Sequence, residues 1–127
     1  IAGAICKQIL ESKGILIGSH LKQIYNIEDD DFNTNYDQLK KQMELMNKSE
    51  FAVINNEVKD QMINCIEKAR ENEDSVGGII ETAVLNIDGG IGEPFFDSIE
   101  SVLSSLIFSV KISRTLPEYL TQTVSTA

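Results

Sequence analysis

The sequence predicts an α+β fold. In three stretches apolar residues recur every three or four positions, the spacing of helices that bury one face, and a fourth such stretch follows a glycine-rich turn. Two other stretches are rich in branched aliphatic residues and fit strands. Apolar residues make up 42% of the 127 residues and charged residues 24%. This balance is typical of globular proteins, and a chain of this length forms one domain by default.

Residues 1–13 are predicted to form the first helix. Ile5 and Ile9 recur at helical spacing, and Gly14 follows the last apolar position, as glycine commonly does at a helix C-terminus. Ile1 already belongs to the apolar pattern of this helix. We therefore expect the natural chain to begin earlier.

A strand is predicted over residues 15–27, which are rich in Ile, Leu and Tyr. Polar residues are interleaved, so we expect one face of the strand to be partly exposed to solvent. The strand ends at the acidic run of residues 28–31. Two helices are predicted next, over residues 35–46 and 57–72. The apolar residues of the second helix share one face: Val58, Met62, Ile66 and Ala69.

Residues 75–87 are predicted to form a strand covered on both faces, because apolar side chains occur on both sides of its alternation. A turn follows at residues 88–94, and residues 97–110 are predicted to form a buried helix that starts with a capping box. We divide the chain into a folded segment, residues 1–110, and a loosely held tail, residues 111–127. The two strands are too far apart in sequence for a hairpin. They either pair across the helices or complete a sheet with strands outside this chain.

The charge balance argues against some classes of partner. The chain carries 20 acidic and 11 basic residues, for a net charge of −9, and its Lys and Arg residues are not clustered. An acidic surface disfavours contact with the phosphates of nucleic acids and with anionic lipids. No apolar run approaches the ~18 residues of a membrane span. We therefore expect neither nucleic acid nor membrane as a partner, and any anionic substrate would be attracted by other parts of the protein.

Three sets of residues are candidates for chemistry, and each has a simpler interpretation. His20 is the only histidine, and a hydrogen-bonded strand histidine is favoured over a general base or a metal ligand. Glu28–Asp31 lacks the alternating spacing of a calcium loop, so a solvated loop is favoured over a cation site. Cys6 and Cys65 are predicted to be reduced, structural residues of helices.

The glycine clusters Gly77-Gly78 and Gly89–Gly92 could cradle an anion with backbone N–H groups. They match neither the dinucleotide fingerprint nor the P-loop, and no Lys follows either cluster. Backbone turns or close strand packing are favoured. We therefore assign no catalytic, no cofactor-binding and no metal-ligating residue to this chain. From chemistry alone the chain is an α+β domain of unassigned function.

Two blocks of the sequence resemble the chorismate synthase family. Residues 73–81, EDSVGGIIE, match the family's DS-hydrophobic-GG-hydrophobic-hydrophobic-E stretch. Residues 90–100, GIGEPFFDSIE, match the family's entry to a helix, in the right order and at the right spacing. Residues 1–24 are similar to the stretch that follows the family's serine- and arginine-rich flavin motif. The resemblance covers about residues 1–109 and is weakest over residues 28–50.

The resemblance implies part of an FMN-dependent lyase. Members of the family bind reduced FMN and eliminate phosphate from 5-enolpyruvylshikimate 3-phosphate to give chorismate, in aromatic amino-acid biosynthesis. Their helices pack on antiparallel sheet strands and they assemble as tetramers, so the resemblance implies a portion of that fold, a homo-oligomer and a cytoplasmic location. The family's hallmark histidines, early arginines and flavin-binding segments lie outside this chain. His20 is not one of them, and we expect the chain alone to be inactive.

The sequence departs from the family after Ser109, where residues 110–114 lead into a tail unlike the family. We expect either an excised piece that carries foreign sequence or the product of a disrupted gene. An alternative function is a non-catalytic interaction or oligomerisation module that uses the apolar strand faces. A third is a small anion-binding domain that uses the glycine turns.

The helix over residues 97–110 is predicted to pack on the strand over residues 79–87, because both are apolar and one turn joins them. Leu103→Asp should then unfold the chain, since an unpaired carboxylate in an apolar seam costs several kcal/mol against a total stability of ~5–15 kcal/mol. Thermal melting followed by circular dichroism checks this. An unchanged melting curve would contradict the packing.

Overall fold

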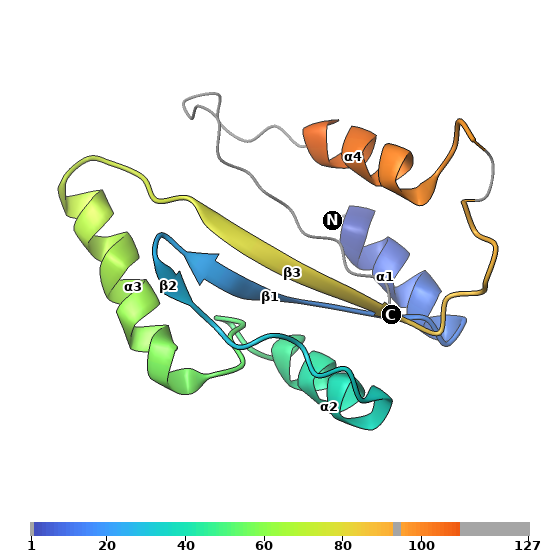
Figure 1. The fold of residues 1–127 in the computed structure, drawn as a ribbon, viewed down its shortest axis with the longest axis horizontal. Helices are drawn as coiled ribbons and strands as arrows, with labels where there is room; N and C mark the ends of the chain where they lie inside the picture. The colour runs from blue at the N-terminus through green and yellow to red at the C-terminus, as the bar shows by residue number, and fades with distance from the viewer. Residues whose placement is uncertain (1, 93–94, 110–127) are drawn as a thin grey trace. The chain divides into compact units, whose positions relative to one another are not determined.

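The computed structural model describes residues 2–92 and 95–109. Within them the chain forms four helices and a three-stranded antiparallel sheet (Figure 1), so the predicted α+β class is confirmed. The described residues divide into two compact units, residues 2–85 and residues 86–92 with 95–109. None of the described helices is long and apolar enough to cross a membrane.

The sheet of the first unit has the strand order β2-β1-β3. It consists of β1 (Leu16–Ile24), β2 (Ile27–Glu28) and β3 (Gly78–Leu85), and β1 pairs antiparallel with both neighbours. β3 pairs with β1 along its whole length. Of the two arrangements that the sequence left open, the strands therefore adopt the one in which they pair across the intervening helices.

The prediction of one continuous strand over residues 15–27 is wrong, because its last residues fold back as β2. Tyr25 and Asn26 make a two-residue turn between β1 and β2. Tyr25 has a φ of 56°, and its N–H donates to the carbonyl of Gly77 at 2.9 Å. Such turns usually carry glycine at a position of positive φ, and this turn has none to reveal it in the sequence. β3 is also shorter than the predicted strand over residues 75–87.

The first helix, α1 (Ala2–Ser12), ends as its sequence predicts. Gly14 has a φ of 82°, a conformation that costs glycine little. The N–H of the next residue, Ile15, donates to the carbonyl of Leu10 at 3.0 Å. This bond closes the helix C-terminus in the manner typical of a glycine stop.

Helices α2 (Tyr36–Met46) and α3 (Asn56–Glu71) confirm the two predicted helices to within a residue or two. Each begins after an asparagine whose side chain accepts backbone N–H groups of the first turn. Asn35 accepts from the residues at the start of α2, and Asn55 accepts from Glu57 at 2.9 Å. Such caps satisfy donors that a helix start otherwise leaves unpaired.

Two apolar clusters form the core of the first unit. The first contains Ile24, Val53 and Met62, with partly buried neighbours that include Val58 and Cys65 of α3. The second lies between α2 and the other end of the β1–β3 pair: Leu39, Met43 and Leu85, flanked by Leu16, Phe32 and Ala83. In Figure 1 α2 lies beside β1, and α3 lies beside β2. The helices therefore cover the sheet at two separate places.

α2 approaches β1 most closely at Gly18. A Cβ atom at this glycine would lie 2.7 Å from Cγ, 2.8 Å from Cβ and 3.2 Å from Cα of Met43. Met43 itself is buried. The close approach therefore depends on the missing side chain of Gly18.

The predicted cover on both faces of β3 is not found for all of its side chains. Leu85 is buried in the second cluster, whereas Ile80 and Val84 on the opposite face are 54% and 37% exposed. The prediction that other elements cover both faces of the strand rests on the apolar side chains of each face. In the first unit α2 and α3 cover one face, and apolar composition alone does not supply a second layer.

The second unit consists, within its described residues, of a turn and helix α4 (Ile99–Ser109). Gly90 and Gly92 have φ values of 85° and 86°, so the turn uses their freedom to adopt positive φ. None of the residues of α4 is buried, so the expectation of a buried helix is not met. The packing of this helix on β3 stays a prediction, and the predicted tail over residues 111–127 lies outside the described residues.

The close contact at Gly18 gives a stability test. Gly18→Ala should lower the free energy of unfolding by about 1–3 kcal/mol, because the backbone of α2 or the side chain of Met43 must shift to admit the methyl group. The control is Gly3→Ala in α1, where a new Cβ has no atom within 4 Å. That change should be neutral or stabilising by up to about 1 kcal/mol. Urea unfolding measures both, and equal stabilities of the two variants would contradict the predicted packing.

Candidate functional site

Ionisable side chains gather around His20, in the middle of β1. The ring is 1% exposed. Its Nδ1 lies 3.1 Å from Oδ2 of Asp29, and its Nε2 lies 2.6 Å from Oε2 of Glu81. Glu81 stands opposite His20 in the register of β1 and β3. The ring of Phe32 packs edge-on against the imidazole, with centroids 4.5 Å apart. Both ring nitrogens therefore face carboxylates, and the imidazole itself is shielded from bulk water.

The two carboxylates also accept hydrogen bonds from backbone N–H groups in other parts of the chain. Asp29, 3% exposed, accepts from the N–H of Ile54 at 2.6 Å and from that of Asn55 at 2.8 Å, just before α3. Glu81 accepts from the N–H of Phe32 at 3.2 Å. The network therefore ties together β1, β3, the connection from β2 to α2 and the entry to α3.

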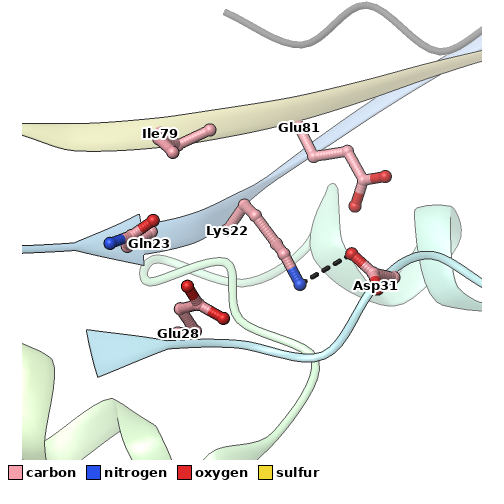
Figure 2. A pocket seen from close by; sticks show the side chains of 6 residues that line it. All are labelled: Lys22, Gln23, Glu28, Asp31, Ile79 and Glu81. Atoms are coloured by element: carbon pink, nitrogen blue, oxygen red, sulfur yellow. Dashed lines mark ion pairs between the residues drawn. The ribbon is translucent and has the colours of Figure 1, made fainter. Parts of the chain in front are cut away.

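Lys22 lies at an irregularity of β1, where the pairing with β3 shifts register between Leu21 and Gln23. Its side chain extends toward Asp31 (Figure 2). Nζ donates to the carbonyl of Asp29 at 2.6 Å and pairs with Oδ1 of Asp31 at 2.6 Å. A bulge of this kind turns a side chain in a direction that regular pairing does not allow.

The pKa values of the two partners of this ion pair shift in opposite directions. Burial lowers the pKa of Lys22, but the hydrogen bond with Asp31 and the nearby carboxylates outweigh it, so the pKa lies above its ordinary value of 10.5. The hydrogen bond and the charge of Lys22 lower the pKa of Asp31 below 3.8. The pair therefore stabilises the fold between the acid range in which Asp31 is protonated and the alkaline range in which Lys22 loses its proton. Since Asp31 is 77% exposed, that contribution is small.

An open hollow of about 250 Å³ adjoins this group of side chains (Figure 2). The residues that line it are Lys22, Gln23, Glu28, Asp31, Ile79 and Glu81. Three carboxylates face one ammonium group, and Asp31 already pairs with that ammonium. The lining therefore does not fit the phosphate of a flavin or of an anionic substrate. Across residues 2–92 and 95–109 no group of His, Cys, Asp and Glu is placed to hold a metal ion.

The structure confirms one interpretation of the candidate residues and corrects another. His20 is a hydrogen-bonded strand histidine, as favoured. The acidic run is not wholly a solvated loop, because Glu28 belongs to β2 and Asp29 is buried as an acceptor of backbone N–H groups. No local signal in the sequence identifies Glu81 as a partner of His20. Strand alternation would have paired them only if the register of β1 and β3 had been known.

The remaining candidates serve the backbone. A Cβ at Gly78 would lie 2.7 Å from the carbonyl oxygen of Gln23, so this glycine permits close strand packing. Gly90 and Gly92 of the turn at residues 89–92 supply positive φ. Both cysteines are free, as expected, with Cys65 partly buried beside the first cluster and Cys6 exposed on α1.

The comparison with protein families gives one clear result. A family model described as chorismate synthase matches residues 1–116. This match begins with α1 and extends past α4, so it includes every described element. It also passes the predicted division of the chain at residue 110, which stays a prediction.

Curated relatives agree with this match. The chain is 32% identical over 114 residues to the chorismate synthase of Trichodesmium erythraeum, with 89% of this chain and 30% of the relative covered. It is 35% identical over 109 residues to that of Pyrococcus abyssi (86% and 28%) and 31% identical over 109 residues to that of Methanococcoides burtonii (86% and 28%). The chain thus spans about 30% of the length of these relatives. On this evidence the chain belongs to the chorismate synthase family.

Proposed function

We propose that this chain is a scaffold portion of an FMN-dependent chorismate synthase. The enzyme would be the lyase that eliminates phosphate from 5-enolpyruvylshikimate 3-phosphate to give chorismate in aromatic amino-acid biosynthesis. The single observation that carries the proposal is the family match over residues 1–116. Because the chain spans about 30% of its relatives, we propose that the catalytic and flavin-binding groups belong to segments of the family that these 127 residues do not represent.

The geometry around His20 supports a structural role for the groups that could otherwise do chemistry. A general acid or base must come within hydrogen-bond reach of its substrate. The side chain of His20 has no exposed surface, and both of its nitrogens are engaged. Elimination of phosphate also needs cationic donors for the departing group. Lys22 is the cation of the hollow, and its ammonium group is bound to Asp31 and to the carbonyl of Asp29.

Cofactor, assembly and location belong to the same proposal. Reduced FMN as cofactor, a homotetramer and a cytoplasmic location rest on the family resemblance. Partners other than nucleic acids and membranes are favoured by the net charge of −9. The acidic lining of the hollow favours a flavin site elsewhere in the assembled enzyme.

A second candidate function has one observation in its favour. Five large hydrophobic side chains among the described residues of the first unit are more than half exposed: Ile5, Ile9, Tyr25, Leu45 and Ile80. Exposed apolar area of this kind suits association with another protein surface. A non-catalytic interaction or oligomerisation module would use this area and would need no flavin.

The proposal predicts that the purified 127-residue chain releases no phosphate from 5-enolpyruvylshikimate 3-phosphate, even with added FMN under anaerobic reducing conditions. The reason is that His20 and Lys22, the histidine and the cation beside the hollow, are engaged in the fold. A phosphate-release assay measures this, with the chorismate synthase of Pyrococcus abyssi as the positive control.

Turnover by the chain alone would show that the scaffold assignment is wrong. His20, Lys22 and Arg114 would then be the first residues to substitute, although Arg114 lies outside the described residues. Self-association measured by analytical ultracentrifugation, without turnover, would favour the interaction module.

A further inference from the structure

The imidazole of His20 is placed to donate two hydrogen bonds. A neutral imidazole has one N–H and one lone pair, whereas ionised carboxylates only accept. Each ring nitrogen of His20 faces a carboxylate oxygen, of Asp29 at 3.1 Å and of Glu81 at 2.6 Å. With both carboxylates ionised, both contacts are hydrogen bonds only if both nitrogens carry protons. The geometry therefore fits an imidazolium cation between two anions.

We propose that protonated His20 acts as a latch, and that loss of its second ring proton releases the connection between β2 and α2 from the sheet. The latch joins β1 to β3 through Glu81 and to the β2–α2 connection through Asp29. Its ring is covered by Phe32 from that same connection. The device is independent of the proposed enzymatic role, because it requires only the folded chain.

The charges around the ring determine how the latch responds. Asp29 and Glu81 contact it directly, and within the described residues α2 and α3 place no ionisable side chain in hydrogen-bond contact with it. The nearby Lys22 pairs with Asp31, and Glu28 lies in the lining of the same hollow. Without the imidazolium charge, the side-chain carboxylate of Asp29 loses its only charged hydrogen-bond donor among these residues.

A neutral ring would weaken the interactions of both carboxylates with His20. One of them would face a nitrogen lone pair and both would lose the cationic partner, and removal of one charge from a largely buried ion pair is strongly destabilising. Movement of Glu81 would break its bond to the N–H of Phe32, and movement of Asp29 would break those to Ile54 and Asn55. The β2–α2 connection and the entry to α3 would therefore loosen together.

Nuclear magnetic resonance of the whole chain tests the latch. His20 is the only histidine, so its ring nitrogens give unambiguous signals. We expect both ring nitrogens to be protonated at about pH 5.5, a pH below the reference pKa of a histidine side chain. As the pH rises, the second ring proton and the protection of the Phe32, Ile54 and Asn55 amides should be lost over the same interval. Exchange of these amides, corrected for its intrinsic pH dependence, should become about tenfold faster or more. The amide of Asn47, bonded to the carbonyl of Met43 at the far end of α2 from this connection, is the internal control.

Two substitutions separate the latch from general destabilisation. His20→Gln cannot donate to both carboxylates, and Glu81→Gln keeps an acceptor but removes one anion. In both variants the coincident pH-dependent loss of protection should shrink or disappear. Glu44→Gln, an exposed carboxylate of α2, removes the same charge and should keep the behaviour of the parent chain.

The decisive result comes from the parent chain, so it stands even if a variant fails to fold. A folded chain with only one protonated ring nitrogen at about pH 5.5 would overturn the proposal. So would protection of the Phe32, Ile54 and Asn55 amides that stays constant while the ring loses its proton, or a pH response that His20→Gln retains.

Discussion

The antiparallel pairing of β1 with β3 is the interaction on which the rest of the structure depends. It joins segments separated by two helices, and the two side chains of its central contact, His20 and Glu81, are 61 residues apart in sequence. The entropy cost of closing such a long loop rises only slowly with its length. Burial of apolar side chains beneath the sheet by α2 and α3 offsets that cost. Both apolar clusters include residues of these strands, so neither cluster would form without the pairing.

Along β1 the packing alternates between apolar and charged contacts. Gly18 admits the buried Met43 of α2, and Ile24 belongs to the cluster beneath α3. His20 lies between these two positions with its carboxylate partners. Burial of ionic groups is favourable only when their hydrogen bonds are complete, and no buried side-chain nitrogen or oxygen of the described residues lacks a partner. The polar network therefore fixes the register of the strands and the entry to α3 together.

The elements that the sequence predicts well are those whose signals are local. The period of α3 and the glycine stop of α1 at Gly14 both lie within a few residues of the structure that they specify. The burial of Asp29 could not be foreseen, because its donors, the amides of Ile54 and Asn55, come from a segment 25 residues away. The hairpin at Tyr25 was missed because its positive φ is supported by a contact with the distant Gly77. Partners of a site residue become predictable only when strand register is known.

We propose that family membership and catalytic competence are separate properties of this chain. The family model matches residues 1–116. His20 and Lys22, the lysine that lines the hollow, are bound to carboxylates within the fold. The most direct test is an anaerobic equilibrium titration of reduced FMN against the purified 127-residue chain. We expect saturable binding to the chorismate synthase of Pyrococcus abyssi, the positive control, and no saturable binding to this chain. Stoichiometric binding of reduced FMN to this chain would contradict the proposal.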